Sequence, residues 1–416
     1  MGSDRLYQIP LNPYNPDILK GNTMAALDSF RETTRAWLEK NCPPGARGEG
    51  EIPNGSTKIE ILDSDTKLWL DRMVKKGWTV PAWPKEYGGD SLSKDEYVVL
   101  LEEMKRINAR PPLSGFGTSM IGPTLLEYGT EEQKKRHIPR IARAEVEWCQ
   151  GYSEPGSGSD LASLQTRAIL DGDHYVINGS KIWTSGAHNA DWMFILVRTD
   201  LEAPKHEGIS FMLLPMDQPG VEVRPIKLIS GNSPFNQVFL NNALAARDDL
   251  VGSLNRGWTI GKRLLQHERS GMDQLLRGGT SSDTSNLSTL ARNYIGEIGG
   301  KIANSSVRDS ILDHDMTLRI LNLTKRRVVE ESADGSTPGP ATSIFKLMTT
   351  DLEKVHYDLA TSLRGSQGFG WDGDSFSDTE LEDLRLLLSS RAASIYSGSN
   401  EIQRNIIAKR VLGLPD

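Results

Sequence analysis

The sequence is poor in cysteine and has no long apolar run, and both shortages exclude classes of protein. Two cysteines, Cys42 and Cys149, stand among 416 residues. These are too few for a disulfide framework, so we expect a reducing, cytoplasmic environment. The longest apolar stretch, Met193 to Val197, is far shorter than the roughly 20 residues that a membrane-spanning helix needs. The segment from Met1 to Lys20 is rich in proline and polar residues, and we expect no secretory signal in it.

The sequence also lacks an excess of charge of either sign. It carries 48 basic and 55 acidic residues, a net charge of −7 that is spread without long runs. A nucleic-acid partner would require a concentrated basic face, so none is expected. Neither an HExxH motif nor a cysteine pair at zinc spacing is present, so we expect no metal site.

The common nucleotide-binding motifs are missing as well. The turn Gly156-Ser157-Gly158-Ser159 lacks the third glycine of a dinucleotide-binding loop. Gly261-Lys262 is followed by Arg263 and lacks the upstream glycine of a P-loop. The sequence therefore favours neither a Rossmann fold nor a P-loop fold.

Apolar residues recur at helical spacing at both ends of the chain. The pattern predicts helices over residues 25–40, 59–76, 94–109 and 130–142, the last with Thr130 as its N-cap. Helical spacing returns after residue 251, most clearly over 342–363, where Gly365 is placed as a C-terminal cap. Residues 332–340 are predicted to form a loop. We therefore expect an N-terminal helical domain over 1–148, a middle β domain over 149–251 and a C-terminal helical bundle over 252–416.

The middle segment has the composition of short strands separated by turns. Strands are predicted over residues 191–198, 208–216, 221–229 and 235–240. Asn178-Gly179 between two strand-like runs predicts a hairpin, because this pair supplies the positive φ angles of a type I′ turn. Strands without intervening helices favour an antiparallel sandwich or barrel.

Four longer segments occur together in the chain. They are GWTVP to EYGG at 77–89, WCQGYSEPGSGSDLA at 148–162, INGSKIWTSGAHNA at 177–190, and RAASIYSGSNEIQRNIIAKRVLG at 391–413. In this order and spacing the chain resembles the acyl-CoA dehydrogenase family of flavoproteins. The resemblance covers nearly the whole chain. It implies an α+β multidomain fold with an N-terminal helical domain, a middle antiparallel β-sandwich or barrel and a C-terminal four-helix bundle.

The resemblance implies an FAD-dependent α,β-desaturation of an acyl-CoA thioester. A base removes the α-proton, and the β-hydrogen leaves as hydride to flavin N5. By the same resemblance Trp183 would pack against the flavin, Ser185 would hydrogen-bond near N5, and residues 399–401 would lie near the FAD pyrophosphate. The residues implied to bind FAD are Gln150, Gly151, Tyr152, Ser153, Trp183, Thr184, Ser185, Ser362, Leu363, Arg364, Gly365, Ser366, Ser399, Asn400 and Glu401. Ser159, Arg269 and Gly398 are implied to bind the substrate, with Ser159 on the CoA arm.

The position of the catalytic base separates two subgroups of the family. Many members carry a Glu directly after Ile-Tyr in the last segment, where this chain has Ser397. A hydroxyl is a poor acceptor for the α-proton without a base of its own. A second subgroup keeps the Glu directly before an Arg on the helix that opens the C-terminal domain, and this chain has Glu268-Arg269 there. The resemblance therefore implies Glu268 as the base, against the alternative of a solvated surface carboxylate.

Two departures from the family pattern concern the substrate and the FAD phosphates. An Asp is common two residues before the base, where this chain has Gln266. An Arg-Lys-Thr-Phe-Gly segment binds the neighbouring FAD's phosphates in the family, but Gly296 to Lys301 contains no matching Arg. Arg292 and Arg308 are both candidates to replace it.

Three functional alternatives remain at this point. An acyl-CoA dehydrogenase would pass electrons to an electron-transferring flavoprotein, whereas an acyl-CoA oxidase would use O₂. The oxidase is the disfavoured alternative, because those relatives are usually longer and this chain ends three residues after its last segment. The missing Arg segment leaves open a non-catalytic subunit of a heteromeric dehydrogenase. FAD sites between subunits imply a homodimer or homotetramer, with a heterotetramer as the alternative, and the acyl group stays open.

Overall fold

The computed structural model describes residues 16–270, 286–331 and 342–415, and side chains over 25–267, 286–328 and 342–415. The packing divides the chain into two compact units. One contains residues 1–53 and 61–113, and the other contains residues 54–60 and 114–416. None of the helices among the described residues is long and apolar enough to cross a membrane.

The first unit is helical. It contains α1 (Pro16–Asn41), α2 (Ser64–Lys76) and α3 (Lys94–Arg106), with the short helices η1 (Pro44–Ala46) and η2 (Lys85–Tyr87). A capping box between Ser93 and Glu96 starts α3, as its sequence favours. Leu38, Trp69, Met73, Trp78 and Leu100 form the buried core. The helices predicted over 25–40, 59–76 and 94–109 are therefore present, with shifted ends.

The second unit begins with η3 (Gly117–Ile121), α4 (Gly122–Tyr128) and α5 (Glu131–Ala142). Thr130 caps α5: its side chain accepts from the backbone of Gln133, whose side chain bonds back to Thr130. The predicted N-cap is confirmed. These helices group with the sheet rather than with α1–α3, and the proposed boundary at residue 148 stays a proposal.

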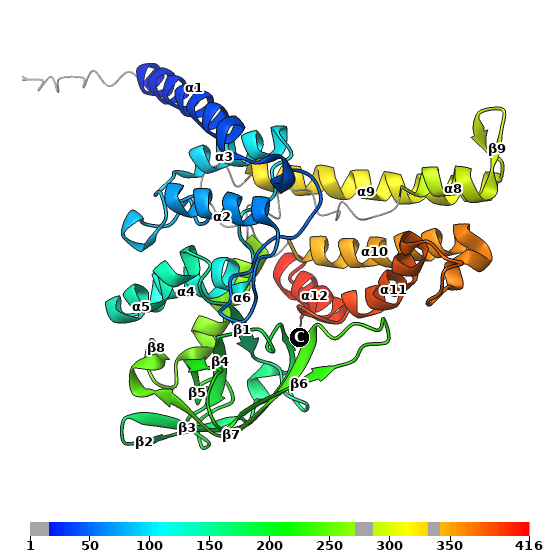
Figure 1. Cartoon of the computed structure of the whole chain (residues 1–416). Helices are drawn as coiled ribbons and strands as arrows, with labels where there is room; N and C mark the ends of the chain where they lie inside the picture. Colours follow the sequence, from blue (N-terminus) through cyan, green and yellow to red (C-terminus); the bar gives the residue numbers. More distant parts are fainter. Residues whose placement is uncertain (1–15, 271–285, 332–341, 416) are drawn as a thin grey trace, which may run out of the picture. The chain divides into compact units, whose positions relative to one another are not determined.

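A mostly antiparallel sheet follows these helices in the chain and is drawn at the bottom of Figure 1. Among the described residues its strands follow the order β6-β7-β3-β2-β4-β5-β8, and β1 pairs with β4 in parallel. The strands are β1 (Trp148–Gly151), β2 (Arg167–Asp171), β3 (His174–Ser185), β4 (Trp192–Arg198), β5 (Ile209–Pro215), β6 (Val221–Ile226), β7 (Phe235–Ala246) and β8 (Leu250–Val251). Short helices η4 (Leu161–Ser163) and η5 (Arg247–Asp249) lie in the connections.

The predicted hairpin at Asn178-Gly179 is wrong, because β3 runs straight through these residues. The turn lies earlier, where β2 pairs antiparallel with β3 and Asp171 faces His174 across Gly172 at φ 60°. Gly179 is instead a site of close approach, since a Cβ there would lie 2.5 Å from the Thr166 hydroxyl. An Asn-Gly pair can thus mark an irregularity within a strand as well as a turn.

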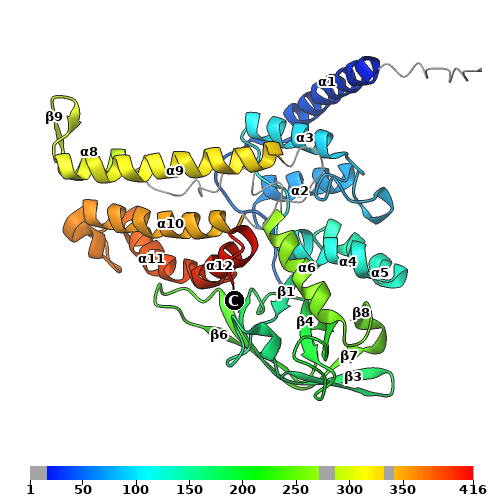
Figure 2. The same ribbon diagram turned by 180° about the vertical axis from the view of Figure 1, so that it is seen from behind.

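The C-terminal helices complete the unit. They are α6 (Gly257–Ser270), α8 (Leu287–Ile295), α9 (Ser305–Glu331), α10 (Ser343–Arg364), α11 (Asp378–Ala393) and α12 (Asn400–Ile406), with η7 (Gly365–Phe369), η8 (Ile407–Val411) and the hairpin β9 (Glu297–Ile298) and β10 (Lys301–Ile302). In both views α10 lies between α9 and α11 (Figures 1 and 2). The predicted cap Gly365 follows α10 at φ 58°. The loop predicted at 332–340 lies outside the described residues.

Candidate functional site

The most unusual backbone of the β region lies in β3, at Trp183. The β3–β7 register advances from Lys181 opposite Val238 to Thr184 opposite Asn236, so one extra residue forms a bulge. Trp183 has φ 60° inside this bulge, which is rare for a bulky residue and marks a site where strain is maintained. Its side chain is 54% exposed. The bulge therefore presents a large aromatic face outward.

Hydrogen bonds hold the bulge at its far end. Asn236, which is fully buried, donates from Nδ2 to the Thr184 carbonyl at 3.0 Å. The backbone N–H of Gly186 donates to the Pro234 carbonyl at 3.0 Å. The Thr184 hydroxyl, although buried, has no hydrogen-bond partner among the residues whose side chains are described. Such a group is normally satisfied, so it is a candidate to meet a ligand.

The loop after β1 adjoins this bulge, since the Ile182 N–H donates to the Ser153 carbonyl at 2.8 Å. Gln150 contributes a second buried donor, Nε2, for which the described part of the chain offers no partner. A Cβ at Gly151 would overlap the Met193 sulfur, so this position requires glycine. Tyr152 is buried, and its hydroxyl donates to the Gly261 carbonyl of α6 at 3.4 Å. Polar groups of β1 and β3 thus meet along one edge.

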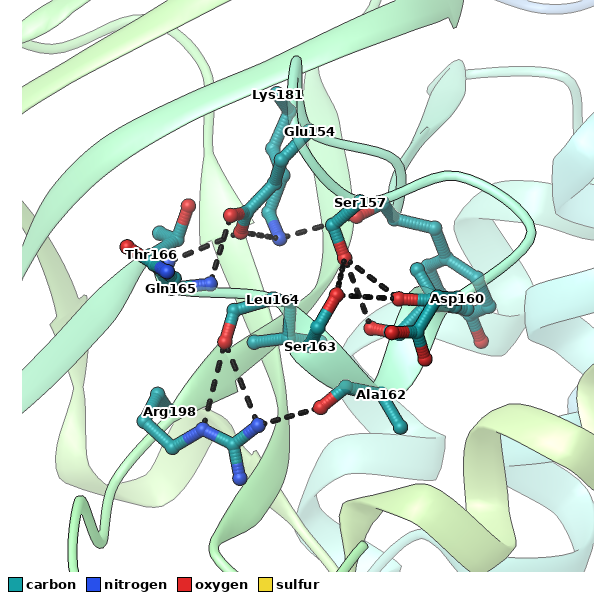
Figure 3. A network of polar contacts seen from close by, with 12 residues as sticks. Glu154, Ser157, Asp160, Ala162, Ser163, Leu164, Gln165, Thr166, Lys181 and Arg198 are labelled. Carbon is teal, nitrogen blue, oxygen red and sulfur yellow. Dashed lines mark hydrogen bonds and ion pairs between the residues drawn. The ribbon is translucent and has the colours of Figure 1, made fainter. Parts of the chain in front are cut away.

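A buried ion pair lies under this edge (Figure 3). Lys181 is fully buried, and its Nζ lies 2.7 Å from Oε1 of Glu154. Burial lowers the pKa of Lys181 to about 8, against the opposing effect of Glu154. Burial also raises the pKa of Glu154, but the charge and hydrogen bond of Lys181 outweigh it and the net shift is downward. Both groups are therefore charged at neutral pH. The sequence analysis missed this pair, although a Lys at an inward-facing strand position is a signal.

Ser159 lies in the exposed turn that follows Glu154. The turn is closed by reciprocal backbone hydrogen bonds of 2.9 Å between Glu154 and Ser157. Ser157 is buried and bonds to the Asp160 carbonyl at 3.0 Å. The predicted CoA-side residue is thus carried by a rigid turn next to the flavin-side segment.

Helix α6 carries Glu268 and Arg269 in its last turn. Its first turn packs directly on β5, where a Cβ at Gly257 would overlap the backbone of Ser210 and Phe211. The side chains of Glu268 and Arg269 lie outside the described ones. Glu268 stands 11 residues beyond Gly257, about 16 Å along the helix axis.

The predicted C-terminal FAD residues lie at the end of α10. Ser362, Gly365 and Ser366 are exposed, and nothing lies within 4 Å of a Cβ built on Gly365. Leu363 is part of the helical core. Arg364 is 5% exposed, and its guanidinium is engaged by Asp383 at 2.5 Å and by the Tyr294 hydroxyl at 2.8 Å. Its charge is therefore neutralised inside the chain.

The second predicted group lies at the start of α12. The Ser399 hydroxyl caps the helix by accepting from Ile402, and buried Asn400 bonds to Thr350 at 3.1 Å. Glu401 is exposed, and Gly398 has φ 84°. Ser397, which replaces the base of other family members, has φ 53° in the same turn.

Both candidates for the missing phosphate-binding arginine have partners in the chain. Arg292 pairs with Glu297, and Arg308 donates to the Ile302 carbonyl. The segment Gly296–Lys301 forms a hairpin around Gly299 and Gly300. The structure brings the residues of β1 and β3 together, whereas those of α10 and α12 belong to a separate helical surface.

One further titratable residue was missed. Glu147 precedes β1, is 8% exposed, and has one carboxylate oxygen without a hydrogen-bond partner. Burial raises its pKa to about 7, although Asn54 donates to it at 3.4 Å. Asp191 raises this pKa further, and Lys58 opposes the rise. The segment 54–60 is thus fixed beside the flavin-side edge.

Comparison with known proteins agrees with this arrangement. Family models for the N-terminal, middle and C-terminal domains of acyl-CoA dehydrogenases match residues 25–145, 149–243 and 255–412. The acyl-CoA dehydrogenase IpdE1 of Mycobacterium tuberculosis is 37% identical over 398 residues, which cover 94% of this chain and 99% of the relative. The chain belongs to the acyl-CoA dehydrogenase family.

Solved structures of family members share the fold. The "Tcur3481-Tcur3483 steroid ACAD" has a TM-score of 0.70 at 31% identity, covering 94% of this chain and 98% of that chain. The ChsE4-ChsE5 complex of M. tuberculosis has a TM-score of 0.70 at 26% identity, covering 99% and 100%. Members of the family are FAD flavoproteins and oxidoreductases acting on CH–CH bonds, and the chain is an enzyme of this kind. The predicted architecture, enzyme class and cofactor are confirmed.

The residues present fit the flavin. An exposed Trp183 offers a face for a planar ring, and the buried Gln150 Nε2 and Thr184 hydroxyl have no hydrogen-bond partner among the described residues. A ligand with hydrogen-bonding ring edges would meet these needs. The edge formed by β1 and β3 is therefore suited to a flavin.

Proposed function

We propose that this chain desaturates a CoA thioester between its α and β carbons, with Glu268 as the base that removes the α-proton. The observation that carries this proposal is the 37% identity to an acyl-CoA dehydrogenase across 94% of the chain. FAD, when bound, would supply the two-electron acceptor for the hydrogen that leaves the β-carbon.

The chain's own residues divide the remaining tasks. Trp183 covers one face of the flavin, and Ser185 with the loop Gln150–Ser153 provides its polar edge. Ser159 contacts the CoA arm, and Arg269 and Gly398 lie on the substrate side. Ser362–Ser366 are proposed to approach the FAD of a neighbouring subunit, and Ser399–Glu401 to lie near the FAD pyrophosphate, with no metal ion required.

The choice of Glu268 follows from what stands at the alternative position. Ser397 has no carboxylate, and an alkyl hydroxyl does not accept an α-proton unaided. Glu268 is carried by a helix whose first turn packs on β5 and which Tyr152 tethers through Gly261. A base on a firmly packed helix can be held over one carbon atom of a bound substrate.

The acyl group proposed is a large, ring-bearing one of steroid origin. Two solved structures named steroid ACAD are 30% and 31% identical to this chain and cover 94% of it. Ser270, Gly271, Gly278 and Gly279 are small residues along the expected pocket, and they lie outside the residues whose side chains are described.

The partners proposed are an electron-transferring flavoprotein and at least one further subunit. One structural neighbour is a complex of two different chains, which favours the heteromeric alternative, while a homodimer or homotetramer serves the same intersubunit site. A cytoplasmic location is proposed from the two free, buried cysteines.

The experiment is anaerobic mixing of the purified, yellow protein with two CoA thioesters, one with a steroid-derived acyl chain and one with a straight chain. Flavin absorbance should be lost rapidly with the first and slowly with the second. Equal rates would contradict a preference for steroid-derived acyl groups but would still support the desaturation reaction. A yellow protein that neither thioester bleaches would contradict the reaction, and a colourless one would favour a non-catalytic subunit.

A further inference from the structure

We propose that the buried Lys181–Glu154 pair is a positioning device that locks the flavin-side bulge, the loop after β1 and the CoA-side turn into one register. This inference rests on the proposed function. Neither residue touches the flavin edge itself, so both act through the backbone that they hold.

Lys181 joins two of the three segments. Its Nζ donates to the Tyr152 carbonyl at 3.1 Å and to Glu154 at 2.7 Å (Figure 3). It is the residue at which the register of the bulge begins, two positions before Trp183. One ammonium group thus fixes the base of the Trp183 bulge against the peptide that leads into Ser153.

Glu154 joins the third segment. Its two carboxylate oxygens accept from the backbone N–H groups of Gln165 at 2.7 Å and Thr166 at 3.0 Å. Its own backbone closes the turn with Ser157 that carries Ser159. Arg198 secures the other side of this turn by donating to the carbonyls of Ala162, at 2.6 Å, and Leu164.

The chemistry of the pair suits positioning better than stability. Side chains of Lys181 and Glu154 are 0% and 8% exposed, so their desolvation opposes the attraction between them. An apolar pair could fill the same volume, but it could not bond to a carbonyl of one loop and two N–H groups of another. The strained φ of Trp183 needs such over-determined surroundings.

The pair therefore couples two ligand positions. The carbonyls of Tyr152 and Ser153 are held by Lys181 and by the Ile182 N–H, while the Ser159 turn is held through Glu154. A shift of either partner would displace the flavin edge and the CoA turn together.

The test uses the double variant Lys181→Met/Glu154→Gln, which removes both charges and keeps the side-chain lengths. A single Lys181→Met would leave a buried, unpaired carboxylate and is expected to fold poorly. Three quantities are measured: FAD affinity by flavin fluorescence, visible circular dichroism of the bound flavin, and hydrogen exchange of the apoprotein. We expect FAD affinity to fall about 10- to 100-fold, the size of one or two lost charge-assisted hydrogen bonds. We also expect an altered dichroism and faster exchange in residues 150–166 and 181–186.

Glu103→Gln is the matched control. Glu103 is equally buried, at 3% side-chain exposure, and bonds to Arg31, Arg35 and Arg106 in the first unit. This variant should lower the melting temperature and leave FAD affinity, dichroism and exchange in the two segments unchanged. If the double variant does not fold, Glu154→Gln alone carries the same three measurements, because the Lys181 ammonium keeps the Tyr152 carbonyl and the new amide oxygen as acceptors.

The outcomes separate the inference from the proposed function. The inference would be overturned if the folded double variant kept the FAD affinity, dichroism and hydrogen exchange of the wild type. The proposed function would still stand if the wild-type flavin is bleached by its substrate. A wild-type protein that binds no FAD would overturn the proposed function. In that case hydrogen exchange of the apoprotein alone shows whether the Lys181–Glu154 pair holds residues 150–166 and 181–186 together.

Discussion

Two regions that the family resemblance implies for the same cofactor differ in how their predicted FAD-binding residues are bonded. At the edge formed by β1 and β3, buried polar atoms of Gln150 and Thr184 have no partner among the described residues, and Trp183 is exposed on a strained backbone. At the end of α10 and the start of α12, the predicted residues Arg364 and Asn400 are buried and bonded within the chain, although the nearby Thr361 hydroxyl has no partner among the described residues.

The unsatisfied groups at the β1–β3 edge are candidates to bind a ligand, whereas the bonded groups of α10 and α12 stabilise the fold. Unsatisfied buried polar atoms are rare in folded proteins, so those of Gln150 and Thr184, beside the exposed Trp183, indicate a binding surface. A guanidinium already neutralised by an Asp has little left to offer to a phosphate. Arg364 thus supports the C-terminal surface, and the exposed Ser362 and Ser366 are its better candidates for contact.

Among the tests of this comparison, replacement of Arg364 is expected to change the free energy of unfolding most. Arg364→Met removes the guanidinium that is ion-paired with the buried Asp383, which should lower the free energy of unfolding by about 3–5 kcal/mol. Urea unfolding of the protein measures the loss. A variant of unchanged stability that no longer binds FAD would show that Arg364 serves the cofactor and not the scaffold.

The pH dependence of the free energy of unfolding tests whether Glu147, which precedes β1, is buried in its protonated form. The pKa of Glu147 is raised to about 7, so the folded state binds an extra proton between the ordinary Glu pKa and that value. Stability from this group is complete at low pH and is lost as pH rises through about 7. Glu147→Gln should therefore match the wild-type protein near pH 4 and exceed it by about 3 kcal/mol at pH 8. A constant difference across that range would contradict the buried, proton-binding Glu147.

The exposed face of Trp183 gives a prediction on affinity. Because the ring is 54% exposed, Trp183→Ala leaves little cavity and should change the melting temperature only slightly. Flavin fluorescence titration should show FAD affinity lower by about 10- to 100-fold, the range of one lost aromatic stacking contact and its apolar area. A large loss of stability with unchanged affinity would place this ring in the core.

Replacement of Thr184 tests whether its buried hydroxyl is unsatisfied, and its expected effect on stability is the smallest of the four. Thr184→Val removes a buried hydroxyl without a partner and keeps the side-chain shape. The apoprotein should become more stable by about 1 kcal/mol, because the cost of an unmet polar group disappears. Thermal unfolding of the apoprotein measures this gain, and a destabilised variant would mean that the hydroxyl is satisfied.

The elements could largely be predicted from the sequence because their signals are local. Thr130 with Gln133 marked the start of α5, and Gly365 marked the end of α10. Asn178-Gly179 misled, because only Gly179 has a positive φ, of 150°, and its lack of a side chain serves close packing against Thr166 and not a turn.

The partners of buried charges could not be predicted, because they are distant in the chain. Glu154 and Lys181 are 27 residues apart, and Arg364 meets Tyr294 across 70 residues. A motif assigns a residue to a site, but burial and bonding decide whether that residue supports the site or contacts the ligand.

The measurement that tests the account most directly is the rate of flavin bleaching in three proteins, the wild type, Glu268→Gln and Ser397→Ala. Each is mixed anaerobically with the same steroid-derived acyl-CoA, and the loss of flavin absorbance is followed. The account predicts that Glu268→Gln bleaches at least about 10²–10⁴-fold more slowly than the wild type, the usual contribution of a general base, while Ser397→Ala stays close to it. A Glu268→Gln protein that bleaches at the wild-type rate would contradict it.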